Sequence, residues 1–288
     1  MSLQIPVSFV QQYKANLIVL SQQKGSRFRS CVTVDGSVTG TSMFFDRLGA
    51  TSASPKTTRH GDTPLVDSPH SRRMVTLTPY EWADLIDTAD KVRLLIEPQS
   101  DYATNAVNAM GRSMDDLVAA AFGGNAYGGV AGATAVPLPS GQKVVVAATN
   151  LTLAKLLNAK RILDENEVDD SERYIAVTPK MLEALLNVAE VKSSDYNTVK
   201  ALVRGELDTY LGFKFVKSNR LPANTTANGH FAYCWQKRAV GLAIGAEIKT
   251  EVGPRADKSY STQVFVSMDL GATRIEDEAV VEIDCLAG

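Results

Sequence analysis

The sequence predicts an α+β fold, on the strength of three observations. A long run with helical spacing occupies the first half, helix and strand patterns alternate over residues 150–222, and strand-like runs dominate from residue 231 onward. The chain has 288 residues and is 44% hydrophobic, which is enough for one sizeable core or two modest ones.

The overall composition excludes several classes of protein. A net charge of −2 lacks the basic excess expected of a protein that binds nucleic acid tightly. We expect no signal peptide and no membrane span, because the first residues lack a basic, apolar and cleavable pattern and no apolar run reaches 18 residues. Cys31, Cys234 and Cys285 are odd in number and far apart, which indicates free, mostly buried thiols.

Residues 1–45 are expected to form an extended arm containing a strand or two, because valines there alternate with Ser, Thr and Gly. The arm has a net charge of +3, from four basic residues and one acidic residue. These are Lys14, Lys24, Arg27, Arg29 and Asp35.

Residues 46–78 form a polar insertion rich in Ser, Thr, Pro and Gly, and they include His60 and His70. A segment this long with little to bury is uncommon within a compact domain. Because residues 74–78 resemble a returning strand, we predict a two-stranded flap that projects from the body.

A helix is predicted to begin at residue 79. Thr78 can cap it, Pro79 suits its first position and Glu81 completes a capping box, with Trp82 on its apolar face. A strand over residues 92–97 is expected to follow.

A spine helix is predicted over about residues 101–122, capped by Ser100 or Asp101 and ended by Gly123 and Gly124. At 1.5 Å per residue it would be about 33 Å long. Its apolar stripe consists of Ala103, Val107, Met110, Met114, Leu117, Val118 and Ala121, and Arg112, Asp115 and Asp116 are expected to face elsewhere.

After a Gly-rich loop over residues 123–141, the chain alternates between strand and helix patterns. We expect a strand at 142–149, a helix capped by Asn150, a strand at 173–179, a helix opening at Pro179 and a strand at 212–222.

The sequence contains no set of residues that predicts catalysis, a metal site or a cofactor. The Gly-rich loop follows a helix, whereas a dinucleotide fingerprint follows a strand. His60, His70 and His230 lack metal-ligand spacing, and no GxSxG elbow is present. We interpret the acidic cluster of Glu276, Asp277 and Glu278 as a solvated turn between strands.

Four passages and their order resemble the major capsid proteins of tailed bacteriophages, which share the Hong Kong 97-type fold with encapsulin shells. The passages are LVAAAFGGNAYGGVAGA, RYIAVTPKMLEALLN, LGFKFVKSNRLP and VSMDLGATRIEDEAVVEI, the last with Gly271, Arg274 and Val281 in the expected places. The resemblance spans roughly residues 40–285, and the order and spacing are its specific part.

The resemblance implies an N-terminal arm at 1–45 and an extended β-hairpin loop at 46–78 that lies over a neighbour. It implies a peripheral domain with the spine helix at 79–149 and 229–288, and an α/β axial domain at 150–228. It further implies a non-enzymatic shell protein that assembles as pentamers and hexamers and encloses double-stranded DNA without sequence specificity. A separate scaffolding protein, a portal and a cement protein would be partners, with assembly in the host cytoplasm and a final location in the virion capsid.

Candidate contacts between subunits are charged. The arm, at +3, is hypothesised to pass near a neighbour's residues 271–288, whose net charge is −4. Some relatives form a Lys–Asn crosslink, for which Lys56 could serve, but residues 231–288 contain no Asn and we predict none. The candidates are Lys14, Arg27, Arg29, Lys56, Arg59, Arg72, Arg73, Glu276, Asp277 and Glu278.

Three alternatives stay open at the level of sequence. An encapsulin-type shell would have the same fold and enclose protein cargo. A soluble α/β enzyme would use the Gly-rich loop as a ligand site. A minor shell or decoration protein would not assemble alone.

Overall fold

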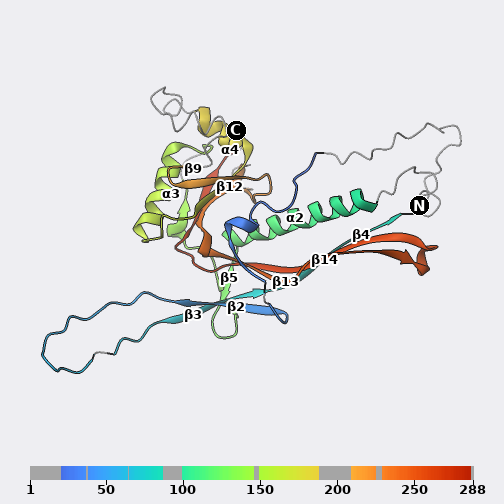
Figure 1. Cartoon of the computed structure of the whole chain (residues 1–288). Helices are drawn as coiled ribbons and strands as arrows, with labels where there is room; N and C mark the ends of the chain where they lie inside the picture. The colour runs from blue at the N-terminus through green and yellow to red at the C-terminus, as the bar shows by residue number, and fades with distance from the viewer. Residues whose placement is uncertain are drawn as a thin grey trace.

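The computed structural model describes residues 21–36, 38–63, 65–86, 99–145, 149–187, 209–224 and 229–286. Two long projections extend from a mixed α and β body in opposite directions (Figure 1). One is the flap, and the other is a ribbon of strands β13 (Val240–Arg255), β14 (Ser261–Arg274) and β4 (Thr78–Ile86). The predicted strand at 92–97 and the first 20 residues of the arm lie outside the described residues.

The spine helix is confirmed as α2 (Gln99–Gly123), which ends at the predicted glycines. It packs on the ribbon, chiefly on β14, with further contacts to β13 and β4. Its buried apolar residues recur every four positions and so form one stripe. They are Ala106, Met110, Met114, Val118 and Phe122.

The sheet beneath α2 has the order β1-β13-β14-β4, with β1 (Thr33–Asp35) parallel to β13. Strands β13 and β14 form a long antiparallel hairpin from Val240↔Arg274 to Arg255↔Ser261. Alternate residues of β14 face α2, as a strand requires. These are Val264, Val266, Met268 and Leu270, each 2% exposed or less.

The predicted helix from residue 79 is wrong, because this segment is strand β4. It pairs with β14 from Leu270↔Thr78 to Thr262↔Ile86. Tyr80 and Trp82 alternate toward the core, which is the two-residue period of a strand. Pro79 is tolerated because β4 is an edge strand and needs no ladder hydrogen bond on its outer side. Long-range pairing therefore overrides the local capping signature.

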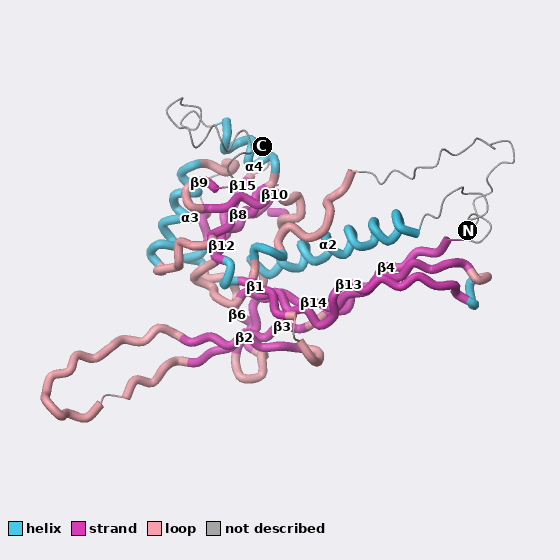
Figure 2. The backbone as a smooth tube through the Cα atoms, viewed as in Figure 1, coloured by secondary structure: helices cyan, strands magenta, loops and turns pink. Residues whose placement is uncertain are grey.

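The flap is rooted in a sheet of order β2-β3-β5-β6. Strands β2 (Ser42–Leu48) and β3 (His70–Thr76) pair antiparallel, as predicted, and β5 (Ala126–Gly128) and β6 (Thr134–Val136) come from the Gly-rich segment. The β2–β3 pairing stops at Leu48↔His70. Residues 49–69 beyond it are here called the flap loop, and those of them that the structure describes, all but residue 64, extend into solvent as irregular chain (Figure 2).

The rest of the body is an α/β unit whose sheet has the order β7-β15-β12-β8-β10-β9, with β11 beside β12. Helices α3 (Leu153–Glu165) and α4 (Pro179–Asn187) pack with it. The cap of α3 is Thr152, whose side chain accepts from Lys155 N–H, and the predicted cap Asn150 lies two residues earlier. The strands are β7 (Lys143–Val144), β8 (Arg173–Val177), β9 (Thr209–Tyr210), β10 (Phe213–Lys217), β11 (Ala223–Asn224), β12 (Gly229–Gln236) and β15 (Val280–Cys285).

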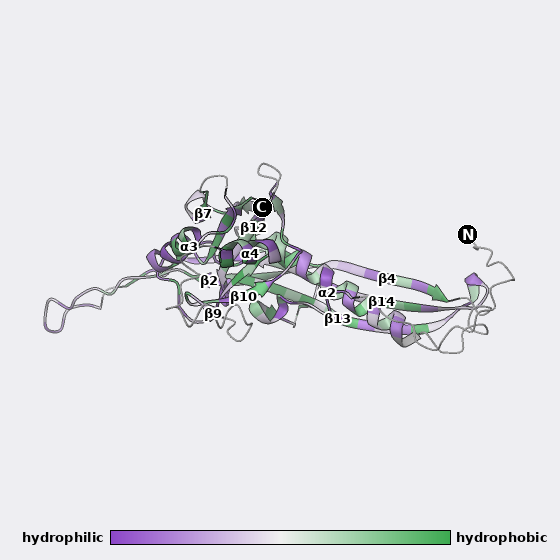
Figure 3. Cartoon of the chain, turned by 90° about the horizontal axis from the view of Figure 1, so that it is seen from above, coloured by the Kyte–Doolittle hydropathy of each residue, from purple (hydrophilic) through white to green (hydrophobic). Residues whose placement is uncertain are grey.

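Two hydrophobic cores meet at β12, whose alternate side chains contribute to one or the other. Trp235 is fully buried on the α2 side, with its ring centroid 4.4 Å from that of Phe122. Cys234 points to the other core, beneath α3 and α4. Figure 3 shows hydrophobic residues gathered in the body and in the strands beside α2, whereas the flap is drawn mostly in purple and pale tones. The flap loop is therefore not part of either core.

Candidate assembly surfaces

The flap loop buries almost nothing in its own chain. Lys56, Arg59 and His60 are exposed, and Leu65 is 100% exposed. Neither Lys56 nor Arg59 forms an ion pair with a residue in the described part of the chain. An apolar side chain and two cations presented in this way gain contacts only from another molecule.

A buried charge cluster fixes the base of the flap to the body. Arg73 of β3 donates from Nη2 to Asp277 Oδ2 at 2.6 Å, and Arg274 at the end of β14 donates from Nε to Asp277 Oδ1 at 2.6 Å. Arg73, Arg274 and Asp277 are 6%, 1% and 6% exposed, respectively. A buried charge needs such pairing, because removal from water strongly disfavours an unpaired ion.

Arg274 also joins the end of α2 to the Gly-rich segment. Its guanidinium donates to the carbonyl oxygens of Phe122 at 3.1 Å, Gly124 at 2.7 Å and Val136 at 2.9 Å. One side chain therefore contacts the last turn of α2 and strand β6, and through Asp277 it reaches the flap strand β3. This network sets the direction in which the flap leaves the body.

The interpretation of the acidic cluster as a solvated turn is wrong for Asp277, which is buried between the two arginines. Its neighbours Glu276 and Glu278 are exposed. Partial burial and the repulsion from Glu278 raise the pKa of the Glu276 carboxyl. Among the candidate contact residues, Arg73 and Asp277 thus pair within one chain, whereas Glu276 and Glu278 face outward.

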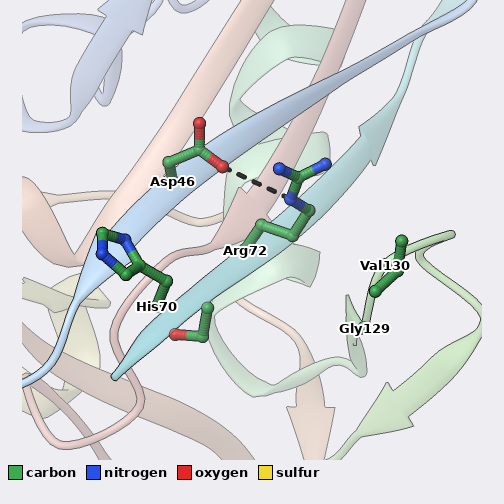
Figure 4. A pocket seen from close by; sticks show the side chains of 6 residues that line it. Asp46, His70, Arg72, Gly129 and Val130 are labelled. Carbon is green, nitrogen blue, oxygen red and sulfur yellow. Dashed lines mark ion pairs between the residues drawn. The ribbon is translucent and has the colours of Figure 1, made fainter. Parts of the chain in front are cut away.

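A shallow hollow of about 670 Å³ lies between the flap base and the Gly-rich segment. Figure 4 shows Asp46, His70 and Arg72 on one side of it and Gly129 and Val130 on the other. Arg72 lies 3.4 Å from Asp46 in an ion pair, and its guanidinium is 5.2 Å from the centroid of the Phe44 ring.

The hollow presents a surface that another molecule could contact. Val130, at its rim, is 90% exposed and so presents an apolar side chain to solvent. In the described part of the chain, no group of three or more His, Cys, Asp or Glu side chains is placed to hold a metal ion. No described helix combines the length and apolarity needed to span a membrane.

The arginines of the arm have partners in their own chain. Arg29 forms an ion pair with Glu247 of β13, and the Arg27 guanidinium donates to the carbonyl oxygen of Lys217. Lys14 lies outside the described residues. The structure therefore does not bring Arg27 or Arg29 to residues 276–284 of the same chain.

Asp115 was not among the sequence candidates, yet it is a major anchor. The sequence places it away from the apolar stripe of the spine helix, and there it is fully buried and accepts hydrogen bonds from the arm. The available signal was Gly111, because glycine in a helix interior is unfavourable unless another backbone approaches closely.

Comparisons with known proteins agree with this architecture. The phage capsid protein family matches residues 5–287. The capsid protein of cyanophage P-SCSP1u is 20% identical and superposes with a TM-score of 0.73, covering 97% of this chain and 94% of that one. The capsid protein of Ralstonia phage GP4 is 11% identical, with a TM-score of 0.75 and coverage of 100% and 98%.

A third solved structure, from Mycobacterium phage Che8, is 14% identical with a TM-score of 0.68, over 96% of this chain and 98% of that one. No curated protein matches the sequence. Neither an encapsulin nor an enzyme is supported by these comparisons. The chain belongs to the phage capsid protein family, and it is a structural capsid protein with the Hong Kong 97-type fold.

Proposed function

We propose that this chain is the major subunit of a tailed-phage head, which it builds as pentamers and hexamers of itself. The observation that carries the proposal is the pair of projections that leave the body in opposite directions, the flap and the ribbon (Figure 1). Surfaces on opposite sides of one subunit make heterologous contacts, which propagate around and between rings. A dimer contact would instead bury one patch against itself.

The parts of the chain have distinct roles in this proposal. Residues 150–228 act as the axial domain around ring centres, and strands β7, β12 and β15 complete its sheet. The rest of residues 79–149 and 229–288 acts as the peripheral domain. The flap, residues 46–78, lies over a neighbour as the extended loop, and residues 1–45 act as an arm. Support comes from the flap loop, whose described residues are exposed apart from the half-buried Ser68 and gain burial only from a second copy.

Among the candidate contact residues, we propose that Lys56, Arg59, Arg72, Glu276 and Glu278 meet neighbouring subunits, because all five are exposed. Exposed pairs of this kind contribute about 0–1 kcal/mol each, so they set register more than affinity. Arg73 and Asp277 act from inside by holding the flap in its direction.

The head is proposed to enclose double-stranded DNA without sequence specificity, to lie in the virion and to be assembled in the host cytoplasm. A net charge of −2 suits a wall that encloses DNA without gripping it. A separate scaffolding protein, a portal and a cement protein are the proposed partners. No catalytic role is proposed.

Trypsin digestion tests the proposed contact of the flap. The purified protein is first separated by size into dissociated subunits and particles, and each fraction is then digested. In dissociated subunits, cleavage after Lys56 and Arg59 should be rapid because both residues are exposed. In particles the same sites should be protected by the neighbour, while the exposed Lys258 at the ribbon tip gives a second site for comparison. Equal cleavage of the flap in both fractions would contradict a flap that lies over its neighbour.

A further inference from the structure

We infer that residues 22–28 form a strap held on α2 by Asp115, and that this attachment positions the N-terminal arm for assembly. The inference rests on the proposed function, because the arm acts between subunits only in a shell. Figure 1 shows the blue N-terminal segment descending onto the C-terminal half of α2. Each helix residue that meets it lies three or four positions from another member of the set, so they share one face. They are Asn105, Asn108, Gly111, Arg112 and Asp115.

Asp115 is the centre of the attachment. Its carboxylate is 0% exposed and accepts from Ser26 Oγ at 2.5 Å, from Arg27 N–H at 3.1 Å and from Phe28 N–H at 3.2 Å. Gln23 Nε2 donates to its other oxygen. A carboxylate buried in this way must have its hydrogen bonds satisfied, and here the strap supplies them.

Backbone contact adds a steric requirement. A Cβ atom on Gly111 would lie 2.5 Å from the carbonyl carbon of Gly25, so the strap crosses α2 where the helix has no side chain. On either side of the crossing, Asn108 Oδ1 accepts from Gly25 N–H at 3.2 Å and Arg112 Nη1 donates to Gln22 Oε1 at 2.5 Å. The helix thus has one apolar face for the ribbon and one polar face for the strap.

The strap follows α2 in one direction and ends at a side chain buried in the core. It runs the same way as the helix, from Gln22 beside Asn105 to Phe28 beside Phe122. Phe28 is fully buried with its ring centroid 5.9 Å from that of Phe122. The described part of the arm therefore meets the body along α2 from Gln22 onward, which makes Asp115 a positioning residue for the arm.

The test compares three full-length variants with the wild type by hydrogen exchange and by assembly. Asp115→Asn removes the charge and one acceptor, and Gly111→Ala blocks the crossing while improving helix propensity. Asp116→Asn is the matched control, because Asp116 is adjacent, exposed and paired with Arg220 instead. In both test variants, the amides of residues 26–28 should lose about tenfold or more of their protection. The amides of β12 should keep theirs, and fewer shells should form.

Two results would overturn the inference. Protection of residues 26–28 equal to that of the Asp116→Asn control would show that Asp115 does not hold the strap. Loss of protection with a wild-type yield of shells would show that the strap does not position the arm. A wild-type chain that never forms shells would count against the proposed function instead, so the two failures are distinguishable.

Discussion

Arg73 at the base of the flap donates a hydrogen bond to Asp277 at 2.6 Å, although 204 residues separate them in the sequence. Arg274 binds the other oxygen of the same carboxylate, and both arginines are nearly inaccessible to water. The direction of an exposed flap is thereby set by a buried charge. The base of the flap is thus held by Arg274 and Asp277, which come from the last part of the chain.

Asp277→Asn should destabilise the subunit by about 3–5 kcal/mol, because it leaves two buried guanidinium groups with a neutral partner. Urea unfolding of dissociated subunits measures this change. The control Glu278→Gln alters an exposed carboxylate in the same turn and should change stability by less than about 0.5 kcal/mol. Equal unfolding midpoints for the two variants would contradict the role assigned to Asp277.

Phe28→Ala should cost about 3–5 kcal/mol, as expected for a large aromatic side chain removed from a core. Phe28 is 0% exposed and packs edge-on against Phe122 and Trp235, with centroids 5.9 and 6.0 Å away. Thermal or urea unfolding measures the loss, with Leu48→Ala, at a site 65% exposed, as the comparison. If the two variants were equally stable, the arm segment would not be part of the core.

Glu276→Gln should be at least as stable as the wild type at pH 7. Partial desolvation of the carboxyl and the repulsion from Glu278 raise the pKa of Glu276 above its ordinary value of 4.5, so the folded state favours the protonated form. Its ionisation therefore lowers stability as the pH rises through the folded pKa. The difference in melting temperature between variant and wild type should vanish below pH 4.5, where the carboxyl is protonated in both states. A variant less stable at pH 7 would show that the charge is stabilising.

The three cysteines should resist a thiol reagent such as dithionitrobenzoate at pH 8 until the protein unfolds. All three are free and buried. Burial raises the pKa of each thiol, to about 12 for Cys285, so almost no thiolate forms at this pH. Three thiols should react in denaturant, and rapid reaction of any of them in the native protein would contradict the described packing.

Elements with strong local patterns could be predicted from the sequence. The spine helix follows from residues repeated every three or four positions and from its terminal glycines. Strand β8 follows from a short apolar run that is buried on both faces. The two-stranded root of the flap follows from strand-like residues on either side of a polar insertion.

Features that depend on distant partners could not be predicted. The segment after Thr78 has the signature of a helix start, but β14, nearly 200 residues later, pairs with it as a strand. Asp277 looks like part of a solvated acidic turn until Arg73 is placed beside it. Asp115 looks like an outward-facing helix residue until the arm, almost 90 residues earlier, covers it.

Negative-stain electron microscopy of the purified full-length chain, beside its elution volume on a sizing column, shows whether the chain assembles by itself. We expect closed shells, or rings of five and six subunits, because the flap and the ribbon make contacts that propagate from copy to copy. A chain that stays a monomer or a dimer at every salt concentration would contradict its proposed role as the major subunit of a capsid.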